Sequence, residues 1–359
     1  MEIFDVAIVG GGPAGSTCAA FCALAGLHTL VLEREKFPRE KVCGDCLNPS
    51  SWPVLERLEL AGRVLDLPHS KLASIEFIAI GGQKVGIDLP TGSDCEISVK
   101  RSWFDDLLLR RAREVGAVVR EKTIVTALEY NSDWKIVTAG NQDFRARALI
   151  AADGRNSTIA RLRNLLPRLT RERVALQAHV PLPRDFGKRV VLQFLREGYS
   201  GQAPVNNAQL NLCLVGTPPT ISRLRQWARQ HFAIAADQPW RSITPLTRAP
   251  VPCAHENLLF IGDAARVVEP FTGEGIYYAL RSGELAADSV AEIIRGNHRA
   301  LVLREFANAC SQMYKGRLWI NRLARAAVLS PRLASFLIRA ARIEPIFRAL
   351  TKRIATAKR

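Results

Sequence analysis

The stretch Asp5-Val6-Ala7-Ile8-Val9-Gly10-Gly11-Gly12-Pro13-Ala14-Gly15 decides the fold of this chain. Its apolar, β-branched beginning predicts a strand, and the small side chains from Pro13 to Ala25 predict the helix that follows. In Gly10-x-Gly12-x-x-Gly15, the glycines suit a tight turn, a close approach of the backbone to a pyrophosphate, and close helix–strand packing. The sequence therefore predicts the opening of a dinucleotide-binding βαβ unit.

A second strand is expected at Thr29-Leu30-Val31-Leu32-Glu33. Its last residue, Glu33, lies about 20 residues beyond the glycines, where a carboxylate accepts hydrogen bonds from a ribose 2′-hydroxyl. Because a carboxylate repels a 2′-phosphate, we do not expect NADP to be the nucleotide held here. The alternative is a glycine turn with an unrelated acidic residue, and the spacing of Glu33 argues against it.

The rest of the chain alternates between helical and strand patterns. Two alternating segments around Gly81-Gly82 predict a hairpin, and Arg101 to Glu114 predicts a helix. Alternating strands from about Arg173 to Val251 indicate an inserted antiparallel sheet. We therefore expect an α/β chain with a discontinuous nucleotide-binding domain (1–70, 95–172 and 252–300), a substrate-binding β-sheet domain (71–94 and 173–251) and a basic helical C-terminal region (301–359).

A second glycine motif follows the apolar run Leu258-Leu259-Phe260-Ile261. It consists of Gly262-Asp263-Ala264-Ala265 and, further on, Pro270-x-Thr272-Gly273-Glu274-Gly275. Together with Gly10 to Gly15, Arg101 and Asp153-Gly154, it resembles the glutathione-reductase-type flavoproteins that have a single nucleotide-binding fold. Within them the chain is most similar to the geranylgeranyl reductase family, with flavin monooxygenases and halogenases as relatives. The resemblance implies a Rossmann-like fold that binds FAD.

The resemblance also implies where parts of FAD would lie. Asp263 would bond the ribityl chain, and the backbone of Gly273 to Gly275 would face the pyrimidine end of the isoalloxazine, where a helix N-terminus stabilises the anionic reduced ring. Arg101 would lie near the phosphates, and Asp153 near the pyrophosphate or an incoming nicotinamide nucleotide. A surface ion pair and a turn are the alternatives for these two residues. The predicted cofactor-binding residues are Gly10, Gly12, Pro13, Ala14, Gly15, Glu33, Arg34, Arg101, Asp153, Asp263, Gly273, Glu274 and Gly275.

Two residues are candidates for the chemistry. Cys43 follows the second strand in a segment that runs past the flavin ring in the similar family, so its thiol could donate a proton or shape the reactive face. A buried unreactive cysteine, a Cys43–Cys46 redox disulfide and a thioether to the flavin are the alternatives. Tyr199 begins the stretch that corresponds to the family's YxWxFP box, and it could bond a substrate or simply pack in a sheet.

The same box limits what can be said of the substrate. Gly201 and Ala203 stand where the family has tryptophan and phenylalanine, so a geranylgeranyl substrate does not follow from the resemblance. The halogenase motif WxWxIP is absent as well, which argues against halogenation.

A single GxGxxG motif indicates that no second domain holds NAD(P)H permanently. Electrons would come from a transient NAD(P)H, from another protein or from the substrate. We predict an FAD-dependent enzyme that reduces, or in reverse desaturates, a carbon–carbon double bond of a hydrophobic, isoprenoid-like small molecule. An FAD-dependent monooxygenase acting on a phenolic or quinone-like lipid is the alternative, and a non-enzymatic flavoprotein sensor is a minor one.

The charge of the chain is concentrated near its end. The net charge is +16, and the residues after Gly316 hold eleven Lys and Arg side chains against one acid, Glu344. The pattern predicts short amphipathic helices that either cover the FAD-binding part or bind an anionic membrane surface. Nucleic acid is not an expected partner, because no recognition module accompanies the charge.

Composition also bears on location and metals. Eight cysteines without doubled CxxC spacing predict free thiols in a reducing cytoplasm and no metal site. No apolar run reaches the roughly 18 to 20 residues of a membrane-spanning helix. Since the first strand begins by Phe4, we expect no secretory signal. The expected location is the cytoplasm, with peripheral binding at the inner face of the membrane as its extension.

Overall fold

The first sheet carries the glycine loop and is parallel at its centre. The computed structural model describes residues 3–92, 95–140, 142–168, 173–232, 234–268 and 273–315. The predicted opening is confirmed as β1 (Ile3–Val9), α1 (Pro13–Leu24) and β2 (Thr29–Leu32). The strand order is β17-β18-β11-β1-β2-β8, in which β18, β11, β1, β2 and β8 run parallel. The remaining strands of this sheet are β8 (Val118–Arg120), β9 (Val125–Tyr130), β10 (Trp134–Thr138), β11 (Phe144–Ala151), β17 (Ala254–His255) and β18 (Leu258–Phe260).

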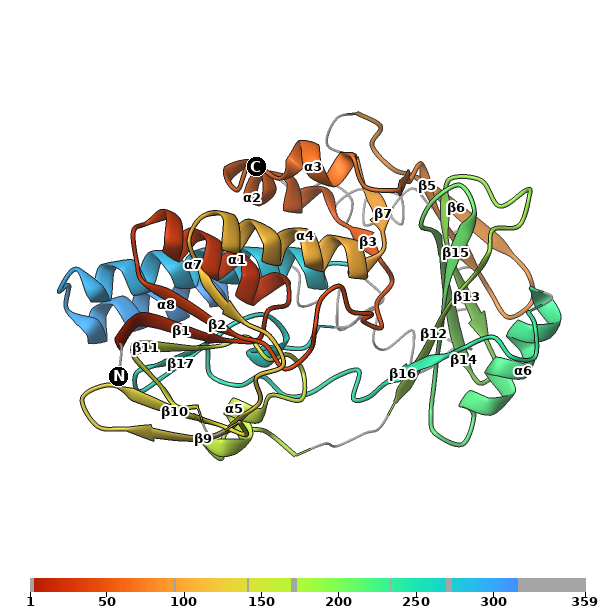
Figure 1. The fold of residues 1–359 in the computed structure, drawn as a ribbon. Coiled ribbons are helices and arrows are strands. Elements are labelled where there is room, and N and C mark those ends of the chain that lie inside the picture. The colour runs from red at the N-terminus through yellow and green to blue at the C-terminus, as the bar shows by residue number, and fades with distance from the viewer. Residues whose placement is uncertain are drawn as a thin grey trace.

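Helices cover one side of this sheet, and the β9–β10 hairpin with α5 (Thr158–Leu162) covers the other (Figure 1). The covering helices are α1, α4 (Arg101–Glu114), α7 (Gly275–Ile294) and α8 (Arg299–Tyr314). Because β1 is buried on both faces, its sequence is an almost continuous apolar run rather than an alternating one. The helix predicted at Arg101 to Glu114 is confirmed with the same bounds.

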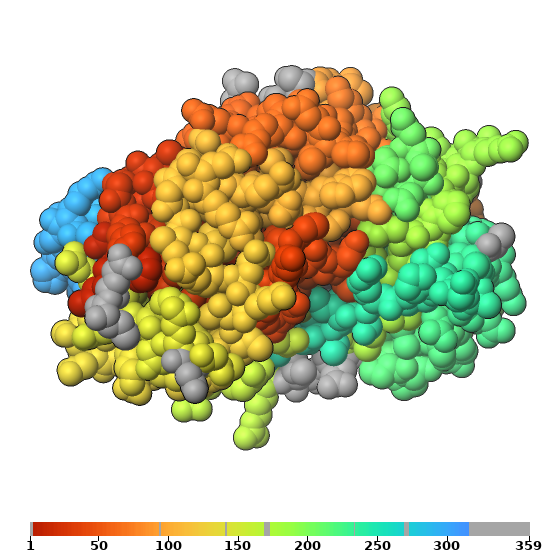
Figure 2. Space-filling model, in the orientation of Figure 1, coloured from red at the N-terminus to blue at the C-terminus, as the bar shows by residue number. Residues whose placement is uncertain are grey.

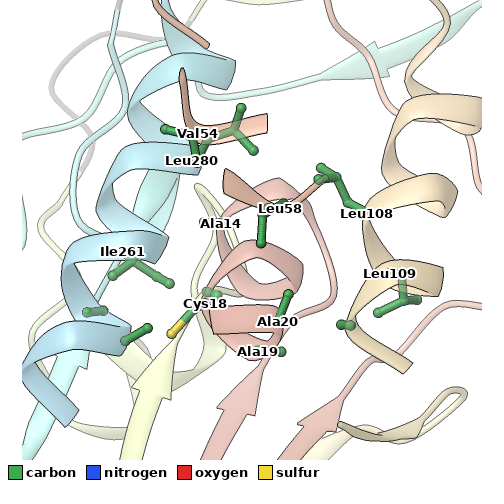
Figure 3. Packing of buried hydrophobic residues seen from close by; sticks show 14 of the residues in the cluster. Ala14, Cys18, Ala19, Ala20, Val54, Leu58, Leu108, Leu109, Ile261 and Leu280 are labelled. Atoms are coloured by element: carbon green, nitrogen blue, oxygen red, sulfur yellow. The ribbon is translucent and has the colours of Figure 1, made fainter. Parts of the chain in front are cut away.

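Small side chains let α1 pack tightly between α7 and α4. Figure 3 shows Cys18 on the side of α1 that faces α7, while Leu108 and Leu109 project from α4 toward α1. On α7, a Cβ added to Gly283 would lie 2.5 Å from the carbonyl oxygen of Ala14. Such a contact is too short for any side chain, so a glycine is required where the two helices cross. The packing fixes the N-terminal end of α1 against the start of α7.

The second sheet has seven strands in the order β16-β12-β15-β14-β13-β5-β6, with α6 (Ile221–His231) beside it. Its strands are β5 (Ser74–Ile78), β6 (Lys84–Asp88), β12 (Val174–Pro181), β13 (Arg189–Leu195), β14 (Gly198–Pro204), β15 (Gln209–Gly216) and β16 (Arg241–Ile243). The hairpin predicted around Gly81-Gly82 is confirmed as β5 and β6. The sheet is antiparallel except between β5 and β13, which run parallel. These two strands are more than 100 residues apart in the sequence, so no hairpin joins them.

Smaller elements complete the described chain. A three-stranded sheet contains β3 (Cys46–Leu47), β7 (Ile97–Val99) and β4 (His69–Lys71), and the short helices are η1 (Pro49–Ser51), α2 (Trp52–Arg57), α3 (Ala61–Leu65) and η2 (Gly262–Ala264). Within the described ranges, no helix is both long and apolar enough to cross a membrane. The predicted amphipathic helices after Gly316 lie outside the described residues, and the domain boundaries stay predictions.

Candidate functional site

A cavity of about 550 Å³ extends from the glycine loop to the second sheet. Four of its loops follow the carboxyl ends of the parallel strands β1, β2, β11 and β18, the edge at which open α/β sheets bind ligands. The chain after β2 continues between the two sheets. Figure 2 shows its orange-red surface between the yellow-orange surface around α4 and the green and teal surface of the second sheet.

The backbone of the glycine loop packs too closely against neighbouring backbone to carry side chains at two positions. Gly10 has φ +106°, and a Cβ there would lie 2.4 Å from the carbonyl oxygen of Ala152. A Cβ on Gly15 would lie 1.8 Å from the carbonyl oxygen of Gly10. No side chain caps the N-terminus of α1, which begins after Gly12. The free N–H groups of this first turn therefore form an anion site that suits a diphosphate.

Glu33 lies opposite the glycine loop and is buried. Its Oε2 accepts a hydrogen bond from the Gly11 N–H at 2.6 Å, and its Oε1 accepts one from the Glu35 N–H at 2.8 Å. A carboxylate has about four lone-pair sites, so it can also accept from a ribose hydroxyl. Glu33 and Arg34 both line the cavity, and their role in holding the nucleotide stays a prediction.

Arg101 is buried rather than on the surface, so the alternative of a surface ion pair does not hold. Its Nε and Nη2 donate to the two carboxylate oxygens of Asp105 at 2.6 and 2.8 Å, and Arg39 Nη1 lies 3.2 Å from the same carboxylate. Burial opposes the charged form of Arg101, but Asp105 and the Cys43 thiol hold its pKa above the usual arginine value. Sequence analysis missed Asp105, although its i,i+4 spacing on a helix was a visible signal.

Lys41 is a second group that the sequence analysis missed. Burial, followed by the charge of Arg155, lowers its pKa from 10.5 to about 8. The side chains of Arg39, Arg101 and Arg155 line the same cavity, and in the described part of the chain no acid lies within ion-pair distance of Lys41. The positive charge of Lys41 therefore fits the diphosphate of FAD, whose negative charge would offset it.

The two aspartates of the predicted site have different surroundings. Asp153 Oδ2 accepts from the N–H groups of Thr158 and Ile159 at the start of α5, and burial raises its pKa. Asp263 Oδ2 accepts from Arg155 Nη2 at 3.0 Å. Both residues line the cavity. Asp153 therefore caps a helix whether or not it also contacts a nucleotide.

The second glycine motif is held against the first. The Gly262 N–H donates to Ser282 Oγ on α7 at 2.9 Å, and a Cβ on Gly262 would lie 2.9 Å from the Cβ of Ala14. Gly273 and Gly275, at the start of α7, line the cavity, whereas Glu274 between them is buried beside it. Thr272 and Pro270 lie outside the described residues.

The loop around Cys43 is anchored by the second sheet. The Cys43 carbonyl accepts from Gln177 Nε2 at 2.9 Å and from Asn211 Nδ2 at 2.7 Å. Asp45, with φ 60°, is fully buried and bonds His179 Nε2 at 2.8 Å. Burial raises the pKa of Asp45, and the His179 hydrogen bond partly offsets this. These contacts fix the position of the Cys43 backbone between the two sheets.

The cysteines and the polar groups beside them also face the cavity. Cys43 and Cys46 are free thiols, so no disulfide joins them in this structure. Glu96, which precedes β7, is buried and lines the cavity, and burial followed by the charge of Glu274 raises its pKa to about 7. A single glutamate outside any motif gave no signal in the sequence.

The far end of the cavity is mostly apolar. Tyr199 on β14 lines it and is 4% exposed. A Cβ on Gly201 would make only ordinary contacts, 3.7 Å from Leu192 Cδ2 and 3.9 Å from Cys213 Cβ. The other apolar residues of this end are Ile75, Ala175, Val190, Leu192, Ala203, Val215, Ile243 and Leu246. Among the described residues, no group of three or more His, Cys, Asp or Glu side chains could hold a metal ion.

The fold and the site define a class of protein, the FAD-dependent oxidoreductases. Residues 4–183 match the family described as "FAD binding domain", and the chain belongs to this family. It is 31% identical over 313 residues to the menaquinone reductase of Mycolicibacterium smegmatis, covering 79% of this chain and 75% of that protein. It is 26% identical over 325 residues to the digeranylgeranylglycerophospholipid reductase of Thermoplasma acidophilum, covering 83% and 80%.

A solved structure supports the fold independently. The flavin-dependent brominase Bmp2 superposes with a TM-score of 0.82 at 20% identity, over 99% of this chain and 93% of that one. The predicted fold class and the resemblance to geranylgeranyl reductases are confirmed. The roles of the individual site residues stay predictions.

Proposed function

We propose that this chain uses FAD to reduce a carbon–carbon double bond in a hydrophobic, isoprenoid substrate, with NAD(P)H as a transient electron donor. The observation that carries the proposal is the cavity itself. Its polar end, which includes Arg39, Lys41 and Arg101, suits a flavin nucleotide, and its apolar end, on the second sheet, suits a lipid. The Cys43 loop lies between the two ends and is fixed by hydrogen bonds to the sheet.

The residues of the chain would divide the work. The N-terminus of α1 with Arg39, Lys41 and Arg101 would hold the diphosphate, and Asp263 with the start of α7 would hold the reactive half of the cofactor. FAD, when bound, supplies the hydride chemistry. The apolar side chains of the second sheet would exclude water and align the double bond of the substrate beside Cys43. Tyr199, which lines the cavity, would bond a polar group of that substrate.

The names of the relatives indicate the class of substrate. Menaquinone and a digeranylgeranyl phospholipid both carry long unsaturated isoprenoid chains, and the relatives are named as reductases of these lipids. The altered box supports a substrate with a bulky group. Gly201 and Ala203 leave open the space that tryptophan and phenylalanine would fill in the geranylgeranyl reductases. A menaquinone-like lipid, whose ring needs such space, is therefore our preferred substrate.

A lipid substrate also suits a protein that works at a membrane surface. The eleven basic residues after Gly316 would supply electrostatic attraction to anionic lipid, at about 1 kcal/mol for each residue near the surface. We include peripheral binding to an anionic membrane in the proposal. Flotation with liposomes that contain or lack anionic lipid tests it, and equal recovery in both gradients contradicts it.

Anaerobic turnover tests the main proposal. The FAD-loaded protein, given NAD(P)H and menaquinone in detergent without oxygen, should form a product two hydrogens heavier that air does not reoxidise. A product that air returns to menaquinone would show reduction of the ring instead. A strict need for oxygen with a hydroxylated product would establish the monooxygenase alternative.

A variant of the apolar end adds a control. Gly201→Trp should fill the cavity, lower turnover at least about 10-fold and leave bound FAD unchanged, whereas Gly201→Ala should have little effect because its methyl group fits without a clash. Full turnover by Gly201→Trp would mean that the substrate lies elsewhere.

A further inference from the structure

Glu96 occupies a place in the cavity that the proposed function leaves without a role. It precedes β7 and is only 8% exposed. Its Oε1 lies 3.9 Å from the position of a Cβ on Gly273, and the Cβ of Cys46 lies 4.0 Å from the same position. Gly273 belongs to the turn that the family resemblance puts at the pyrimidine end of the isoalloxazine. Glu96 therefore faces the reactive end of the cavity.

The groups around Glu96 are acidic or neutral. Glu274, at the start of α7, acts on it electrostatically, and so does the neighbouring Cys46 on β3. Tyr278 on α7 donates a hydrogen bond to Glu274 at 3.4 Å. Among the described residues, no Lys, Arg or His pairs with Glu96. The negative charge of Glu274 favours the protonated form of Glu96, because neighbouring carboxyls bind a proton more tightly than an isolated one.

We propose that Glu96, together with Glu274, is the site that binds the proton accompanying reduction of the flavin and then delivers it to the substrate. A hydride from NAD(P)H adds a negative charge to the bound cofactor, close to the two carboxyls. In response, Glu96 takes one proton from solvent. In the second half-reaction Glu96 gives this proton to one carbon of the double bond while the other carbon receives the hydride. The double bond thus gains two electrons and two protons, and the cofactor returns to its oxidised form.

The uptake of a proton follows from the physical surroundings. Glu96 has a pKa of about 7, so near neutral pH it is close to half protonated before any electron arrives. A further negative charge in a buried site raises the proton affinity of a nearby carboxyl. The delivery step depends on the proposed function, whereas the uptake step depends only on the binding of FAD.

The test is the pH dependence of the reduction potential of bound FAD in Glu96→Gln. For a two-electron couple, each bound proton changes the equilibrium tenfold per pH unit, which is about 30 mV. Between pH 7 and 8.5, the reduction potential of bound FAD should fall with pH more steeply in the unaltered protein than in Glu96→Gln. The difference between the two slopes should be about 30 mV per pH unit. A pH-indicator dye should report one proton fewer taken up by the variant on reduction with dithionite.

Control variants keep the test decisive. Glu76→Gln, which removes a carboxyl paired with Lys84 on the second sheet, should leave the slope unchanged. If Glu96→Gln fails to retain FAD, Glu274→Gln replaces it, because loss of the second carboxyl should lower the proton affinity of Glu96. The proposal is overturned if the variant measured, Glu96→Gln or Glu274→Gln, shows the same pH dependence of the reduction potential as the unaltered protein.

The outcomes separate this proposal from the proposed function. In single turnover with menaquinone, Glu96→Gln should slow product formation by about 10²-fold or more, the usual effect of losing a general acid. If Glu96→Gln changes the pH dependence of the FAD reduction potential but the unaltered protein reduces no double bond, the proton site is supported and the proposed function is contradicted. If the unaltered protein reduces the double bond but Glu96→Gln leaves the pH dependence of the potential unchanged, the proposed function is supported and the proton site is contradicted.

Discussion

Replacement of Asp105 by asparagine tests how the positive charges of the site are held. Asp105 is fully buried, and its carboxylate bonds Arg101 through two hydrogen bonds and also pairs with Arg39. Asparagine keeps the shape but removes the charge, leaving two guanidinium groups without a counterion. Removal of one partner from a buried ion pair costs about 3 to 5 kcal/mol. The side chains of Arg101 and Arg39 are 10% and 16% exposed, so we expect the lower limit, about 3 kcal/mol.

The assay is urea denaturation of the apoprotein, with Asp106→Asn as the matched control. Asp106 is the next residue on α4 and pairs with Arg110, which is 52% exposed, so its loss should cost only about 0.3 to 0.5 kcal/mol. At a denaturant dependence of about 3 kcal/mol per molar urea, Asp105→Asn should lower the midpoint by about 1 M. The control should shift it by less than about 0.2 M.

Repetition of the measurement with saturating FAD tests the placement of the cofactor. If the diphosphate lies against Arg39 and Arg101, its negative charge replaces that of Asp105, and the loss of stability should be smaller in the holoprotein than in the apoprotein. A midpoint within about 0.2 M of the Asp106→Asn control would refute the energetic argument. An equal loss with and without FAD would refute the position of the diphosphate.

Four further predictions follow from single sites. Gly283→Ala should destabilise the protein by about 1 to 3 kcal/mol because its methyl group would meet the α1 backbone at 2.5 Å, whereas Gly62→Ala, with open space around it, should not; thermal unfolding distinguishes them. Asp263→Ala should lose bound FAD, and a variant that still co-purifies with a full complement of yellow cofactor contradicts its role. Because the pKa of Glu96 is raised from 4.5 to about 7, its contribution to stability is present below pH 4.5 and lost as the pH rises through 7. Glu96→Gln should therefore exceed the unaltered apoprotein in stability by about 3 kcal/mol above pH 7 and match it near pH 4, and urea midpoints at the two pH values check this. In Gly201→Trp, FAD fluorescence should be unchanged while menaquinone no longer perturbs it, and an unchanged response to menaquinone places the substrate elsewhere.

The nucleotide-binding half of the fold was predictable because its signals are local. The apolar run of β1, the glycines of the first turn and the acid after β2 depend only on the strand, turn and helix that contain them. Of the glycines predicted in the first turn, Gly10 and Gly15 prove to be sterically required, as their short Cβ distances show, whereas a Cβ on Gly12 would meet only the end of the Arg39 side chain, at 3.3 Å. The second sheet was harder, because β14 contains two glycines, a serine and a proline and has little strand propensity of its own. It is a strand because β13 and β15 pair with it on both sides.

The groups that control charge were missed for a different reason. Lys41 and Glu96 have unusual pKa values only because distant segments enclose them, Lys41 by residues after β11 and β18 and Glu96 by the start of α7. The residues around Lys41 and Glu96 that most strongly shift their pKa values are distant in the sequence, so no local pattern predicts these shifts. Both groups line the same cavity and carry charges of opposite sign. The positive charge of Lys41 would favour a bound diphosphate, and the carboxyl of Glu96, with its raised pKa, would favour a proton when negative charge is added nearby. On these proposals, one cavity would both hold FAD and couple its redox state to protonation, and Lys41 and Glu96, which no motif identifies, would contribute to both.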